Sequence, residues 1–171
     1  MTERPVTNMA ASVHQRLLNL AKEQVRPFNE ILQYYAMERF LHRLAHSRHG
    51  NRFVLKGALM LQMWKAPISR PTMDIDLLGR MDNSVDTLVA VTQDICRERV
   101  EPDGLEFVPE TVTGERIAEE AEYAGVRLRL RALLGKARVT IQIDVGFGDA
   151  VYPNPVRGDY PTILPFPAPN L

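Results

Sequence analysis

The 171-residue sequence predicts an α/β (α+β) fold, because helical periodicity near the N-terminus gives way to strand periodicity further along. The strand signal is clearest where apolar and polar residues alternate over residues 126–134 and again over residues 137–145. Gly135 and Lys136 form a short turn between these runs. Alternation on both sides of a glycine-containing turn predicts an antiparallel β-hairpin.

Two helices are expected within residues 1–50. Thr7 or Asn8 is a suitable N-cap for the first helix, and Pro27 suits the first turn of the second. The apolar stripes that define the helices are Val13, Leu17, Leu20 and Ala21 in the first, and Ile31, Tyr34, Met37, Leu41 and Leu44 in the second.

Histidines and arginines share the end of the second helix and the residues that follow it. His42, His46 and His49 recur at helical spacing, which fits either a metal site or a basic surface. Because three arginines lie among them, we predict a solvated basic helix face rather than a metal site.

A core of short strands and helices is expected over residues 51–150. Branched and apolar runs predict the strands, and amphipathic runs of good helix formers predict the helices. In chain order, these elements are a strand at residues 52–55, a helix at 57–64, a strand at 72–79, a helix at 85–96, a strand at 105–112 and then the hairpin.

Residues 151–171 differ in composition from the core. Six of the twelve prolines lie in this segment, and proline disrupts helix interiors and central strands. We therefore expect an extended connector.

Composition limits the class of function. Lys+Arg is 21 and Asp+Glu is 21, so no overall basic field attracts nucleic acid, and any RNA or DNA contact must come from a local patch. The single cysteine excludes an internal disulfide. The polar N-terminus lacks the apolar core of a signal peptide, and no apolar run is long enough to span a bilayer. We expect a cytoplasmic protein without a membrane partner.

Two carboxylates stand in an otherwise apolar strand. Asp74 and Asp76 are two residues apart and point to the same face, where each disfavours ionisation of the other. A divalent cation would relieve this repulsion, and Mg²⁺ accepts such ligands together with phosphate and water. Asp144, on the polar side of the second hairpin strand, is the third candidate ligand, with Asp149 in reserve. Taken singly, each acid is more simply explained as a solvent-facing strand residue.

A short strand leads through Lys56 into a Gly57-Ala58 step at the start of a helix. N–H groups at a helix start bind phosphate, and small residues let the phosphate approach. Arg70 and Thr72, just before the carboxylates, are further candidate phosphate contacts, as is Lys56. A phosphate-binding turn beside a metal-binding pair indicates nucleotide chemistry.

Four segments, RFLHRLAHS, RFVLKGALML, RPTMDIDLLG and IDVGFGD, resemble the AbiEii/AbiGii nucleotidyltransferase-like toxins of bacterial toxin–antitoxin and phage-defence (abortive infection) systems. The resemblance runs from about Tyr34 to the end, and Arg-Pro-Thr-x-Asp-x-Asp-Leu-Leu is its most specific part. It implies the polymerase-β-like nucleotidyltransferase fold, a mixed twisted sheet flanked by helices. It also implies metal-dependent transfer of a nucleotide from an NTP, in some relatives to the acceptor end of tRNA.

On this resemblance, Asp74 and Asp76 match the metal-binding pair, Asp144 matches the third acidic position, and Gly57-Ala58 matches the phosphate-contacting step. Ala58 lacks the hydroxyl that a serine offers in wider relatives. The family also continues into a helical portion with an essential lysine and a later aspartate. We therefore expect the chain to be the amino-terminal part of the family, with its proline-rich tail leading to a missing helical portion.

The expected function is transfer of NMP from an NTP to RNA, such as a tRNA acceptor end, by a toxin with a cognate antitoxin and weak activity in a chain of this length. The alternative is a non-catalytic nucleotide-binding or interaction module. A glycosyltransferase also uses Asp-x-Asp, but the antiparallel hairpin argues against its parallel sheet. Catalysis and Mg²⁺ or Mn²⁺ binding are assigned to Asp74, Asp76 and Asp144, and nucleotide binding to Lys56, Gly57, Ala58, Arg70 and Thr72.

Overall fold

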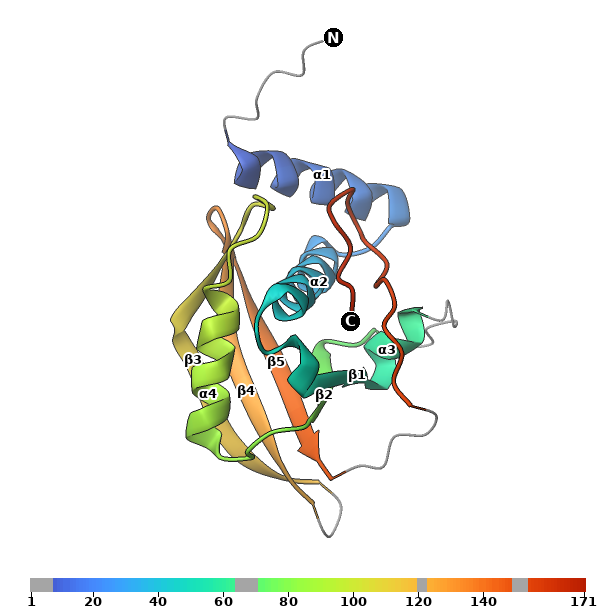
Figure 1. Ribbon diagram of the computed structural model, residues 1–171. Coiled ribbons are helices and arrows are strands. Elements are labelled where there is room, and N and C mark those ends of the chain that lie inside the picture. Colours follow the sequence, from blue (N-terminus) through green and yellow to red (C-terminus); the bar gives the residue numbers. More distant parts are fainter. Residues whose placement is uncertain (1–7, 64–70, 120–122, 149–153) are drawn as a thin grey trace.

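A computed structural model describes residues 8–63, 71–119, 123–148 and 154–171 (Figure 1). Its five strands form one sheet in the order β1-β2-β5-β4-β3. The pair β2–β5 is parallel and the other neighbouring pairs are antiparallel, so the predicted α/β fold with a mixed sheet is confirmed. The strands are β1 (Phe53–Lys56), β2 (Asp74–Gly79), β3 (Leu105–Glu119), β4 (Tyr123–Leu134) and β5 (Ala137–Phe147), and the helices are α1 (Met9–Gln24), α2 (Phe28–His46), α3 (Gly57–Met63) and α4 (Val85–Cys96), with a 3₁₀ turn at Gly50–Arg52.

The predicted hairpin is present as β4 and β5. Leu134 pairs with Ala137 across the Gly135-Lys136 turn, and Gly135 has the positive φ of 59° that such a turn requires. β3 continues to Glu119, beyond the end predicted at residue 112. Its pairing with β4 shifts register between Val108 and Thr113, and this irregularity interrupts the alternation from which the strand was predicted.

The helical layer covers one face of the sheet, where α2 and α4 lie side by side (Figure 1). Phe40 of α2 packs edge-on against Phe107 of β3, with ring centroids 5.9 Å apart. Gly114 of β3 lies against Val85 and Val89 of α4. This arrangement leaves the polar side chains of β2, β4 and β5 on the opposite face, because side chains alternate along a strand.

α2 is the centre of the helical layer, and every residue from 31 to 44 is buried. Arg39 is 1% exposed and its guanidinium contacts Glu38 at 2.5 Å, while Arg43 donates to both carboxylate oxygens of Asp103 at 2.7 and 3.0 Å. The solvated basic face predicted for this helix is therefore wrong. Arginine can be buried here because each guanidinium meets a carboxylate.

The tail at residues 154–171 packs beside α1, α2 and α3 (Figure 1). The backbone N–H of Ile163 donates to Glu38 Oε2 at 2.8 Å, and Arg39 Nη2 donates to the carbonyl of Pro167 at 2.8 Å. Leu164 is buried, and the ring of Phe166 lies tilted against that of Tyr35, with centroids 6.2 Å apart. The tail thus supplies partners for the buried charges of α2. No helix in the described ranges is long and apolar enough to cross a membrane.

Candidate active site

The three predicted carboxylates lie together on the sheet face opposite α2 and α4. Asp76 of β2 and Asp144 of β5 are register partners across the parallel strand pair. Asp74 precedes Asp76 by two residues and therefore points to the same side. The parallel pairing of β2 with β5 thus gathers carboxylates that are far apart in the sequence.

A row of charged residues crosses all five strands at this point. From one edge of the sheet to the other, the register partners are Lys56, Asp76, Asp144, Arg127 and Glu115. Like charges directly opposite each other destabilise a sheet, whereas opposite charges stabilise it. The adjacent acids Asp76 and Asp144 are thus flanked on both sides by cations.

Gly57 brings the backbone close to this row. It joins β1 to α3 with a φ of 72°, a conformation that favours glycine. A Cβ at this position would overlap Oδ2 of Asp76. A glycine is therefore needed where the chain passes so close to the Asp76 carboxylate. The half-buried Ala58 follows in the first turn of α3.

Arg127 is a site residue that the sequence analysis did not single out for this role. Its Nε donates to Asp144 Oδ1 and its Nη2 to Asp144 Oδ2, both at 2.8 Å, in the bidentate geometry of a strong charge-assisted pair. The two-residue hairpin turn fixes the register that places Arg127 opposite Asp144. Pairing of Asp144 with a nearby arginine was the alternative explanation of this residue in the sequence, and the structure identifies that arginine as Arg127.

Charge and burial shift the acid–base behaviour of the site. The pKa of Asp74 is raised, first by burial and then by the neighbouring Asp144 carboxylate, against the lowering effect of Arg127 and Arg129. The pKa of Arg127 is raised, chiefly by its hydrogen bonds to Asp144. A positive charge placed near Asp74 would therefore stabilise its ionised form.

The remaining predicted nucleotide contacts are placed as follows. Lys56 is half-buried at the end of β1. The backbone N–H of Thr72 donates to Tyr34 Oη at 2.9 Å, and its hydroxyl donates to the carbonyl of Asp74 at 3.5 Å, so Thr72 is tied to α2 and to the start of β2. Arg70 and Asp149 lie outside the described residues.

The carboxylates of this face suit a divalent cation that also binds phosphate. Mg²⁺ is usually held by one or two carboxylates, with substrate phosphates and water as the other ligands. Asp74 and Asp76 offer such a pair on one face of β2. Within the described ranges, no group of three or more His, Cys, Asp or Glu side chains is arranged to hold a metal ion. The residues fit a two-carboxylate site that takes its other ligands from a nucleotide and water.

One protein-family model matches this chain. The family model described as the nucleotidyl transferase AbiEii toxin of type IV toxin–antitoxin systems matches residues 39–171. The chain belongs to the AbiEii family. This match confirms the resemblance found in the sequence.

The AbiEii match covers the whole five-stranded sheet and both sides of the charged row. It begins within α2, so α1 and the first part of α2 precede it. Searches of curated proteins and of solved structures found no significant match.

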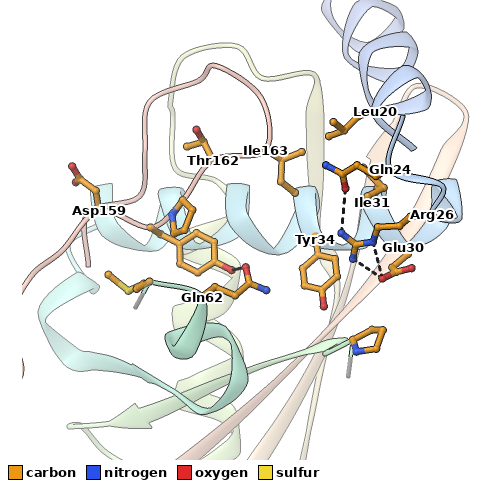
Figure 2. Close-up of a pocket in the computed structure, with 14 residues that line it drawn as sticks. Leu20, Gln24, Arg26, Glu30, Ile31, Tyr34, Gln62, Asp159, Thr162 and Ile163 are labelled. Atoms are coloured by element: carbon orange, nitrogen blue, oxygen red, sulfur yellow. Dashed lines mark hydrogen bonds and ion pairs between the residues drawn. The ribbon is translucent and has the colours of Figure 1, made fainter. Parts of the chain in front are cut away.

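A separate cavity of about 980 Å³ lies among α1, α2, the end of α3 and the tail (Figure 2). None of the three predicted carboxylates is among its described lining residues. Figure 2 shows Arg26 pointing toward Glu30, and the two side chains are 2.5 Å apart. The hydroxyl of Tyr160, another lining residue, donates to Gln62 at 2.8 Å. Arg26 also lies 5.2 Å from the ring centroid of Tyr34. No pattern in the sequence predicts this cavity, because its wall is assembled from segments far apart in the chain.

Proposed function

We propose that this AbiEii-family chain is a metal-dependent nucleotidyltransferase that transfers NMP from an NTP to RNA. The observation that carries this proposal is the register of Asp76 with Asp144, which puts three carboxylates on one face of the sheet beside Gly57. Type IV toxin–antitoxin membership supports a toxin role and a cognate antitoxin as partner. We propose RNA, such as a tRNA acceptor end, as the nucleotide acceptor.

In this proposal, Asp74 and Asp76 hold Mg²⁺ or Mn²⁺, and Asp144 joins them as the third acid. The bound cation supplies positive charge for the phosphate oxygens of the NTP. The raised pKa of Asp74 supports the assignment, because a carboxyl that is costly to ionise is stabilised by a nearby cation.

The Gly57-Ala58 step is proposed to contact the triphosphate through backbone N–H groups. Lys56 and Thr72, with Arg70, are assigned to its charge and orientation. An RNA hydroxyl oxygen would form a bond to the α-phosphorus, while the bond from that phosphorus to its bridging oxygen breaks and pyrophosphate leaves. We assign the hydroxyl proton to Asp144.

The alternative is a nucleotide-binding module without turnover. A specific observation favours it: both oxygens of Asp144 already accept hydrogen bonds from Arg127. If that pair persisted throughout the reaction, only Asp74 and Asp76 would be available to the cation. This chain would then bind nucleotide without efficient transfer.

Incubation with each α-labelled NTP, Mg²⁺ or Mn²⁺ and total cellular RNA tests the two functions. We expect labelled RNA with the native chain and none with Asp74→Ala. Asp86→Ala is the matched control, because Asp86 is an exposed aspartate on α4, which covers the opposite face. Nucleotide binding without labelling would support the alternative, and labelling that survives Asp74→Ala would overturn the assignment of the site.

A further inference from the structure

The pairing of Arg127 with Asp144 conflicts with the role of Asp144 as a metal ligand. Each oxygen of this carboxylate accepts a guanidinium hydrogen bond of 2.8 Å. The Asp144 side chain is only 12% exposed, so it has little freedom to turn away from Arg127. A cation approaching Asp144 would also meet the positive charge of Arg127, which repels it.

The surroundings of Arg127 favour movement of the arginine rather than of the aspartate. The Arg127 side chain is 31% exposed and comes from the polar face of β4. Asp144 is held between Asp76 on one neighbouring strand and Arg127 on the other. A guanidinium also binds a phosphate group in the same bidentate manner as a carboxylate.

We propose that Arg127 is a positioning residue that controls when Asp144 joins the metal site. Arg127 holds Asp144 until a phosphate group of the NTP replaces the carboxylate as its hydrogen-bond acceptor. Asp74 and Asp76 then bind a cation without the nucleotide, whereas Asp144 contributes only with it. This inference rests on the proposed function, because it needs the metal site of Asp74 and Asp76.

Mn²⁺ binding without nucleotide, followed by electron paramagnetic resonance, tests whether Arg127 keeps Asp144 from binding the metal. We expect the native chain to bind one Mn²⁺ that is lost in Asp76→Asn. Arg127→Met should bind this Mn²⁺ at least about tenfold more tightly than the native chain, because Asp144 is then free to act as a third ligand, and outer-shell partners change metal affinity by roughly 10–100-fold. Adding Asp144→Asn to Arg127→Met should remove that gain.

Arg129→Met is the matched control. Arg129 lies two residues away on the same strand and face, and it contacts Glu115 at 2.9 Å and Gln142 at 3.2 Å rather than Asp144. Its removal changes the net charge equally but leaves the hydrogen bonds from Arg127 to Asp144 in place. Any gain in Mn²⁺ affinity then comes only from the charge that Arg129 places near Asp74, and it should stay well below the gain of Arg127→Met. Arg127→Lys keeps the charge without the parallel N–H pair and should restore most of the native behaviour.

Binding of α,β-methylene NTP analogues in EDTA tests whether Arg127 exchanges Asp144 for a phosphate group. Arg127→Met should weaken this binding, and Arg129→Met should not. Unchanged Mn²⁺ binding in Arg127→Met, or a gain that persists with Asp144→Asn, would overturn the inference while leaving the Asp74–Asp76 site in place. Unchanged analogue binding would overturn the exchange with phosphate.

Circular dichroism melting identifies any variant that fails to fold. If Arg127→Met fails, Arg127→Gln, which also removes the charge and the paired N–H groups, takes its place in the comparison with Arg129→Met. If neither the native chain nor Arg127→Met binds Mn²⁺, the proposed metal site and the role of Arg127 are both wrong. Nucleotide transfer by the native chain that is insensitive to Asp74→Ala would reject the proposed function on separate evidence.

Discussion

Gly57 and Asp76 lie so close together that a Cβ on Gly57 would overlap the Asp76 carboxylate. Gly57→Ala should therefore displace Asp76 and also strain the backbone, because φ at this position is 72°. The strain alone costs about 1–2 kcal/mol. We expect lower stability and loss of the Mn²⁺-induced rise in melting temperature, both measured by thermal unfolding.

Gly135→Ala separates the two effects. Gly135 has a φ of 59°, and a Cβ there would meet nothing closer than Ala10 at 4.0 Å. This control should show the backbone cost while keeping the response to Mn²⁺. An equal response of both variants to Mn²⁺ would show that the contact between Gly57 and Asp76 has no part in metal binding.

Asp74→Asn should stabilise the protein near neutral pH. Burial and Asp144 raise the pKa of Asp74 above its ordinary value of 3.8, so the unfolded chain loses this proton first as pH rises. Native Asp74 therefore lowers stability progressively between pH 3.8 and its folded pKa, and the deficit persists above that pKa. Urea unfolding should show a gain for Asp74→Asn at about pH 7 that disappears at about pH 3.

Asp82→Asn should change stability in the opposite direction to Asp74→Asn. Hydrogen bonds from Ser84 and Thr87 lower the pKa of Asp82, so its contribution to stability is present above its unfolded pKa and is lost as pH falls. This variant should lose stability near neutral pH rather than gain it. The same direction of change in both variants would contradict the assigned environments.

Arg39→Met should strongly destabilise the fold. Arg39 and Glu38 are each 1% exposed in their ion pair, and removal of one partner leaves an uncompensated buried charge. Such a change typically costs about 3–5 kcal/mol. Urea unfolding should show this loss, and the double change Glu38→Gln with Arg39→Met should recover part of it.

Arg48→Met is the exposed counterpart. Arg48 contacts Asp94 at 2.7 Å, but its side chain is 79% exposed. Surface pairs of this kind contribute about 0–1 kcal/mol. If Arg39→Met lowered the free energy of unfolding no more than Arg48→Met, the buried Glu38–Arg39 pair would not stabilise the fold more than the exposed pair does.

Replacement of His42 should reduce acid sensitivity. Burial lowers the pKa of His42 from 6.5 to about 4, with further lowering by Arg39, His46 and Arg43. The unfolded chain therefore takes up this proton first, and stability is lost as pH falls from 6.5 towards 4. His42→Met should flatten the stability curve across this window. It also removes Nδ1, which is buried and has no hydrogen-bond partner within the described structure.

His14→Gln is the control for the loss of a histidine, since His14 is only half-buried, on α1. It should leave the acid limb of the stability curve close to that of the native chain. A steep acid limb that survives His42→Met would assign the sensitivity to other groups.

The sequence predicted those parts of the site that depend on local geometry. Alternation put Asp74 and Asp76 on one face, and the Gly135-Lys136 turn fixed the hairpin register that pairs Arg127 with Asp144. The parallel pairing of β2 with β5 joins residues more than sixty positions apart, and no local pattern encodes it. The sequence and the family resemblance named Asp144 as the third acid, but its register with Asp76 was not predicted.

The environment of α2 could not be predicted for a related reason. Its apolar stripe was visible, but its arginines appeared to need solvent. Arg43 pairs with Asp103, 60 residues away. Arg39 pairs with the adjacent Glu38, and this buried pair is completed by tail groups such as the carbonyl of Pro167, 128 residues from Arg39. Whether a charged residue is buried depends on partners that the tertiary fold supplies, and spacing within one helix does not reveal them.

The docking of the tail on α2 has a consequence for biosynthesis. Glu38 meets the Ile163 N–H across 125 residues of sequence, so α2 leaves the ribosome long before the backbone group that satisfies this buried carboxylate has been made. Contacts of such high sequence separation slow folding, because the closure entropy of a long loop is lost before the contact forms. We expect the helical layer of the nascent chain to stay loosely packed until the tail emerges. During that time chaperones can bind it and proteases can cleave it.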